Sequence, residues 1–214
     1  MSRAPMEHSY AEHVADGVVH GIGVVAAIVG VLALLIWAAL RVPLEAHWPL
    51  WLYAVGLLTS FICSAAYNMT LHRKLRPLLR RFDHAAIFLF TAGTYTPMAV
   101  IGLGGATGLA IAVAAWSLAV LGVTLKLAFF HRWYRLSFAL YLIQGWLGVL
   151  AAWPLVQTLP VSVSILLLLG GVVFTIGTIF HHWERLRFNR AIWHSHVLIG
   201  AALHYAAVVL IVAR

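Results

Sequence analysis

The sequence predicts an all-α integral membrane protein, built as a bundle of seven transmembrane helices. Of its 214 residues, 63% are apolar and only 9% are charged, whereas an ordinary soluble domain has roughly 45–50% apolar and about 25% charged residues. Apolar runs that are long enough to cross a bilayer also recur along the chain. This number of charged residues is too small to cover the surface of a soluble domain of this size, so the composition excludes a soluble enzyme.

Runs that contain no Asp, Glu, Lys or Arg locate the spans, since about 20 apolar residues cross roughly 30 Å of hydrocarbon. Five such runs cover residues 17–40, 46–72, 84–125, 136–183 and 191–213. The third and fourth runs are each about twice the length of one crossing. Both contain glycine or proline suited to a turn, at residues 102–108 and between Pro154 and Pro160. We therefore expect seven spans in one domain, residues 1–214, with a short N-terminal segment at 1–12.

The distribution of positive charge predicts the orientation, because short cytoplasmic loops collect Lys and Arg. Twelve of the 14 Lys and Arg residues fall on one side of the seven-span topology, at positions 3, 73, 74, 76, 80, 81, 126, 132, 135, 185, 187 and 190. Arg41 and Arg214 fall on the other side. This split predicts a cytoplasmic N-terminus and an external C-terminus. It also explains the net charge of +8 without nucleic acid as a partner, and the basic 70–82 loop is suited to anionic lipid headgroups.

Ionisable side chains inside a span usually face the bundle interior and mark a site. Polar residues spaced four apart lie at the predicted cytoplasmic end of three helices: Glu12, Asp16 and His20; Ser64 and Asn68; Arg190 and His194. Asp83 and His84 open a fourth helix at the same depth, and His204 lies about 15 Å beyond His194. For His20 and His204, a simple hydrogen bond to a neighbouring helix is as good an interpretation as a functional role. The convergence of four helices nevertheless predicts a polar site.

Several of these residues belong to stretches that resemble the signature of the hemolysin III family, the bacterial branch of the progestin and adipoQ receptors. The stretches are Ser64-Ala-Ala-Tyr67, Arg81-Phe-Asp83-His84 and Ala92-Gly-Thr-Tyr-Thr-Pro97. The segments from Glu12 to Gly23 and from Ile192 to His204 also match, so the resemblance covers about residues 8–210. It implies seven spans with a cytoplasmic N-terminus, in a multi-pass protein of the bacterial inner (cytoplasmic) membrane.

The resemblance also implies a zinc ion near the cytoplasmic face. In the wider family three histidines hold it, one in a Ser-x-x-x-His motif on the second helix and two in His-x-x-x-His on the last. Here Ser64 matches the serine and His194 the last histidine, but Asn68 and Arg190 occupy the other two ligand positions. Because an amide is a poor zinc ligand and a guanidinium has no lone pair to offer, we expect this degenerate site to bind zinc weakly or not at all.

Two explanations of this departure remain open. In the first, which we favour, Arg190 replaces the metal electrostatically by pairing with Asp83 or with the Asp16 and Glu12 carboxylates. In the second, the metal site is displaced by about one helical turn. Its ligands would then be His72 and His84 together with His194 or His196.

The resemblance implies a role in membrane lipid homeostasis and, in eukaryotic relatives, zinc-dependent hydrolysis of lipid amides. Family-matched catalytic candidates here are Asp83, as a general base, and Ser64, but without zinc they lack a polarising cation. The leading hypothesis is therefore a protein that senses or adjusts bilayer state, with membrane lipids as partners. The alternatives are a zinc-dependent, ceramidase-like intramembrane hydrolase and a pore-forming, cytolytic or ion-conducting protein.

Overall fold

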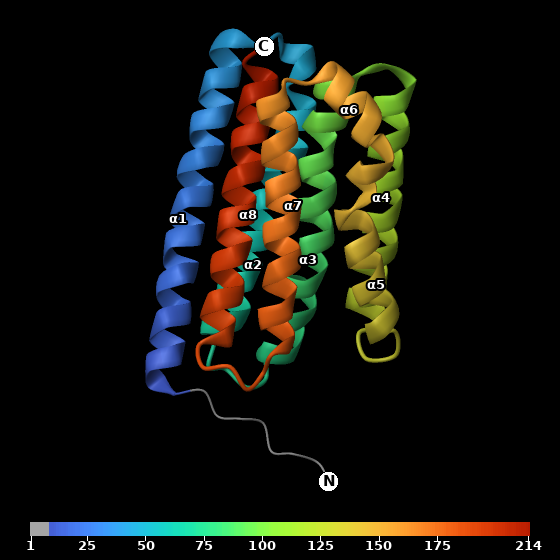
Figure 1. The fold of residues 1–214 in the computed structure, drawn as a ribbon. Coiled ribbons are helices and arrows are strands. Elements are labelled where there is room, and N and C mark those ends of the chain that lie inside the picture. The colour runs from blue at the N-terminus through green and yellow to red at the C-terminus, as the bar shows by residue number, and fades with distance from the viewer. Residues whose placement is uncertain (1–8) are drawn as a thin grey trace.

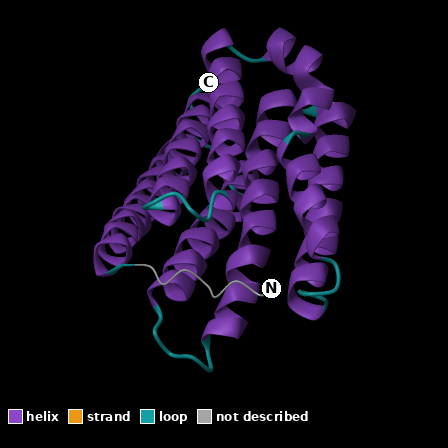
Figure 2. Cartoon of the chain, turned by 60° about the horizontal axis from the view of Figure 1, so that its bottom comes forward, coloured by secondary structure: helices purple, strands orange, loops and turns teal. Residues whose placement is uncertain are grey.

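The computed structural model describes residues 9–214, and these form a bundle of helices (Figure 1). Seven helical segments are long and apolar enough to cross a membrane, which confirms the predicted count for the described residues. Helices joined by loops at the two ends make up this part of the chain, without a strand (Figure 2). The first helix begins at one end of the bundle and the last finishes at the other, as an odd number of crossings requires.

Five of the seven spans consist essentially of one α-helix each. They are α1 (Tyr10–Arg41), α2 (Trp48–Met69), preceded by the short helix η1 (Leu44–Ala46), α4 (Gly105–Ala128), α7 (Val161–His182) and α8 (Asn189–Val212). The third span is α3 (Arg76–Pro97), continued by the π-helical segment η2 (Met98–Leu103). The fifth span is interrupted twice, and it comprises α5 (Tyr134–Gly145), η3 (Leu147–Ala151) and α6 (Ala152–Thr158).

Both long apolar runs break where the sequence predicts. Between η2 and α4 the chain turns at Gly104 and Gly105, which have φ angles of 66° and 56°. Only glycine adopts such angles without steric cost, so these two residues define the turn. In the other run α6 ends at Thr158 and Pro160 caps the start of α7, where its missing N–H costs no helical hydrogen bond. Of the expected N-terminal segment 1–12, residues 1–8 lie outside the described part.

The backbones of α2 and α3 approach each other closely. A Cβ atom added at Gly56 would lie 2.7 Å from the carbonyl oxygen of Leu89, and one added at Gly93 would lie 2.8 Å from that of Leu52. The two glycines thus allow direct backbone contact, as small residues commonly do between membrane helices. α2 carries Asn68 and α3 carries Asp83, so this contact joins two of the helices that bear candidate polar residues.

Two buried side chains hold the irregular fifth span against α3 and α4. The Tyr95 hydroxyl donates to the Gly145 carbonyl at 3.0 Å and accepts from the Gly148 N–H at 2.8 Å. The Gln144 amide donates to the carbonyls of Phe88 and Ala115 at 3.1 and 3.0 Å. Backbone groups freed by a helix break need partners inside a membrane. Tyr95 supplies these partners for Gly145 and Gly148, and α5 packs on α3 and α4. The helix α7 packs along α8 instead (Figure 1).

We predict that Gly56→Ala lowers the thermal stability of the protein in mild detergent, because the new Cβ meets the α3 backbone. Overpacking of this kind costs about 1–3 kcal/mol. The matched control is Gly21→Ala, since no atom lies within 4 Å of a Cβ added there. The two melting temperatures should separate by several degrees; equal values would contradict the close α2–α3 contact.

Candidate functional site

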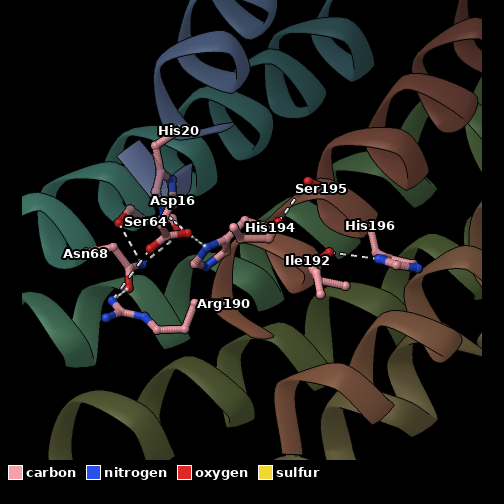
Figure 3. Close-up of polar contacts among 10 residues, drawn as sticks. Asp16, His20, Ser64, Asn68, Arg190, Ile192, His194, Ser195 and His196 are labelled. Atoms are coloured by element: carbon pink, nitrogen blue, oxygen red, sulfur yellow. Dashed lines mark hydrogen bonds and ion pairs between the residues drawn. The ribbon is translucent and has the colours of Figure 1, made fainter. Parts of the chain in front are cut away.

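Three helices bring five polar side chains together at the end of the bundle where α1 and α8 begin (Figure 3). We call them the Asp16 cluster: Asp16 and His20 from α1, Asn68 from α2, and Arg190 and His194 from α8. Asp16 and His20 are one helical turn apart and only 2% and 4% exposed, so α1 turns its polar stripe into the bundle. The predicted stripes of the first, second and last helices therefore meet.

The Asp16 carboxylate is the centre of the cluster. One of its oxygens, Oδ1, lies 2.5 Å from His194 Nδ1 and 3.7 Å from His20 Nε2. The ring centroids of the two histidines are 4.2 Å apart. The other oxygen, Oδ2, lies 3.7 Å from the Arg190 guanidinium. A carboxylate buried in a medium of low dielectric constant is stable only if cations or N–H donors compensate its charge, and here α8 supplies most of them.

Asn68 links the cluster to α2. Its side-chain nitrogen donates to the Ser64 carbonyl at 3.0 Å, which orients the amide oxygen away from its own helix. That oxygen accepts a hydrogen bond from Arg190. The guanidinium therefore lies between the amide of α2 and the carboxylate of α1. Asn68 and Arg190 are the two positions where the family resemblance implies histidine ligands. Of the carboxylates considered as partners of Arg190, which were Asp83, Asp16 and Glu12, the structure pairs it with Asp16.

Glu12 makes a different contact. It forms a capping box with Ser9 at the start of α1, and its Oε1 accepts the backbone N–H of Phe188 at 3.0 Å. Phe188 has a φ angle of 61°, in the left-handed region that a bulky residue rarely adopts. Glu12 thus holds the connection between α7 and α8 against α1, one turn before Asp16.

The family-matched positions do not fit a zinc ion. The oxygen of Asn68 and the guanidinium of Arg190 bond to each other, and only His194 retains a nitrogen that can ligate. A different set nearby has suitable chemistry. One donor atom each of Asp16, His20 and His194 lie within 4.8 Å of one another, and two imidazoles with a carboxylate form a known zinc-binding set. Within residues 9–214, Asp16 Oδ2 and His20 Nε2 are also buried without a hydrogen-bond partner.

The other candidate ligands make their contacts elsewhere. His72 is exposed in the loop after α2, where its ring accepts the Leu75 N–H at 3.4 Å. The His84 ring packs edge-on against Phe130. His196 bonds through Nδ1 to the Ile192 carbonyl of its own helix at 2.8 Å (Figure 3). None of these contacts brings the three histidines of the displaced site to His194.

The two remaining polar candidates lie outside the cluster. Asp83 of α3 lies beside the Ser64 hydroxyl, close enough to His194 and Arg190 to interact with their charges. His204 lies deeper on α8, with Nε2 3.3 Å from the Leu167 carbonyl of α7. Gly170 leaves the space that the His204 ring occupies. His204 thus joins two neighbouring helices and is spatially separate from the charged groups of the cluster.

A cavity of about 1780 Å³ extends from the Asp16 cluster into the bundle. Asp83, Arg190 and His194 line its polar end, and apolar residues such as Leu155 and Leu168 line the rest, between α3 on one side and the fifth span and α7 on the others. Common ligand pockets have volumes of about 300–1,000 Å³. The apolar and polar patterns of the sequence do not predict this cavity. A signal for the packing behind it is Gln144, an amide near the middle of the expected fifth span in the long apolar run 136–183.

Comparisons with known proteins agree with this architecture. A family model described as "Haemolysin-III related" matches residues 8–205. The chain is 36% identical over 200 residues to "Hemolysin-3 homolog" of Bacillus subtilis (strain 168), covering 92% of each chain, and 36% identical over 197 residues to "Hemolysin-3" of Bacillus cereus, covering 92% of this chain and 90% of that one. It is 28% identical over 220 residues to the human "Monocyte to macrophage differentiation factor", covering 96% and 88%.

We predict that Arg190→Ala destabilises the bundle more than Asn68→Ala. The first change leaves the buried Asp16 carboxylate without its guanidinium, which costs about 3 kcal/mol for a buried pair. The second change leaves Arg190 still paired with Asp16. Thermal unfolding in mild detergent measures the difference, and equal melting temperatures for the two variants would count against the pairing.

Proposed function

Because the chain belongs to the haemolysin-III related family, a family of multi-pass membrane proteins, we propose that it binds bilayer lipids and adjusts or senses the lipid state of the membrane. The cavity is the observation that supports this most directly. Its volume of about 1780 Å³ suits a long-chain amphiphile, and it is polar at one end and apolar along the rest. We assign the protein to the cytoplasmic membrane of a bacterium, with the cluster end facing the cytoplasm as the positive charges predict.

In this proposal the Asp16 cluster is a metal-free junction at the polar end of the cavity. Arg190 takes over the electrostatic role of the family's cation by pairing with Asp16, and it also binds Asn68. The junction joins α1, α2 and α8, so a lipid headgroup that draws Arg190 away changes how these three helices pack. Since Arg190 also lines the cavity, lipid binding and helix packing are coupled through this side chain.

The second candidate is a zinc-dependent hydrolase of lipid amides, favoured by the compact grouping of Asp16, His20 and His194. Zinc held by these residues would supply a polarising cation and an acidic bound water. Asp83 and Ser64 line the same cavity end, where Asp83 would act as a general base and Ser64 would orient a substrate oxygen.

We predict that the purified protein contains far less than one zinc per chain, because Arg190 occupies the position of a ligand. The double variant Asn68→His, Arg190→His should bind close to one zinc per chain, since it restores three histidines. Elemental analysis in mild detergent measures both. Stoichiometric zinc in the wild type, abolished by His20→Ala, would support the hydrolase instead.

We predict that Gly171→Phe reduces the amount of lipid that remains bound through purification. Gly171 lines the cavity and no atom lies within 4 Å of a Cβ added there, so the new side chain begins in open space and takes up part of the cavity. The control is Gly21→Phe, which adds the same ring in open space outside the cavity. Native mass spectrometry counts the retained lipids, and equal retention by the two variants would contradict a lipid-binding cavity.

A further inference from the structure

The polar end of the cavity is rich in positive charge. Among the described residues, five cationic side chains line it: Arg76 and Arg80 from α3, Lys126 from α4, Arg185 from the loop between α7 and α8, and Arg190 from α8. Only two carboxylates, Asp83 and Glu184, line the same cavity. Arg190 already pairs with Asp16, yet four cations from three separate segments still surround this end.

The preference of cytoplasmic loops for Lys and Arg does not by itself explain why these cations line the cavity. Positive loops need only lie on the cytoplasmic side, and Arg132 and Arg187 meet that need from the same end of the bundle without lining the cavity. The Arg132 guanidinium lies over the Trp133 ring and that of Arg187 over the Phe188 ring. A subset of the cations is therefore directed into the cavity by the packing of α3, α4 and α7.

Two of the cavity cations lie on a single aromatic ring. The guanidinium of Arg80 and the ammonium of Lys126 are 5.2 and 5.3 Å from the centre of Phe130. Lys126 is buried, with 5% of its surface exposed. Both cations line the polar end of the cavity, so an anion bound there lies near two positive charges in a partly dehydrated site, where their attraction is stronger than in bulk water.

The cations lie next to an apolar channel. Phe138 and Tyr141 of α5 line the cavity near them, and Leu142, Leu155 and Leu168 continue its wall between the fifth span and α7. An inorganic anion would fill the charged end and leave this channel without an occupant. A molecule with one anionic headgroup and a long acyl chain matches both parts.

We propose that the ligand of the cavity is an anionic phospholipid of the bilayer. Its phosphate lies among Arg80, Lys126 and Arg185, and its acyl chain follows the channel between α5 and α7. The proposal rests on the proposed lipid-binding function and adds the class of headgroup. Arginine forks suit phosphate oxygens because they donate two parallel N–H bonds.

The test is competition for the cavity in mild nonionic detergent. The wild-type protein is mixed with phosphatidylglycerol and phosphatidylcholine of identical acyl chains in equal amounts, and native mass spectrometry counts the bound lipids. Each basic residue near an anionic headgroup contributes about 1 kcal/mol, so we expect a preference for phosphatidylglycerol of at least about fivefold. The double variant Arg80→Gln, Arg185→Gln should show a preference at least several-fold smaller than that of the wild type, because only Lys126 of the three phosphate contacts remains.

The control variant is Arg132→Gln, Arg187→Gln, which removes the same charge at the same end but outside the cavity. It should keep the preference, and loss of preference in this control would overturn the assignment to the cavity. Equal binding of the two lipids by the wild type would overturn the headgroup inference while leaving lipid binding intact. Retention of neither lipid would instead overturn the proposed function. A third arm adds oleate, and preference for oleate would assign the cations to a carboxylate and contradict a phospholipid.

Discussion

The buried charge of Asp16 is the constraint on which this end of the bundle depends. A carboxylate at 2% exposure among membrane helices must be compensated by its neighbours. His194 and Arg190 provide the closest contacts from α8, with His20 one turn away on the same helix as Asp16. Because the compensating groups come from another helix, α1 and α8 are stable at this end only in one relative orientation.

The need to compensate the Asp16 charge also explains why Asn68 and Arg190 occur together. An arginine alone at position 190 would need an acceptor besides Asp16, and the Asn68 oxygen supplies it. The amide can do so because its nitrogen is already bonded to the Ser64 carbonyl. The pair therefore acts as a unit, in which a guanidinium and an amide join α8 to α2 as a shared metal ion would. Asn68 and Arg190 are thus chemically matched to each other at the two positions where the family resemblance implies histidines.

A second constraint shapes the cavity. The fifth span is not a continuous helix, and the backbone groups at its breaks need hydrogen bonds that lipid does not supply. The Tyr95 hydroxyl satisfies both Gly145 and Gly148, and Gln144 adds bonds to α3 and α4. These contacts hold α5 on the α3–α4 side while α7 packs along α8. The space between them is the cavity, so polar contacts deep in the membrane determine where a ligand fits.

The sequence by itself determined the number of spans, the break within residues 102–108, and the polar stripes of α1, α2 and α8. These features are local: apolar length, glycine conformation and four-residue spacing act within one segment. Only the tertiary structure decided that Arg190 pairs with Asp16 while Glu12 binds the Phe188 N–H, and that His84 and His196 face other partners. Such choices depend on how each helix is rotated about its axis, and close packing sets that rotation, as where the Trp193 and His196 side chains of α8 pack over Gly177 of α7. The cavity likewise depends on contacts between residues some 50 positions apart, which no local pattern encodes.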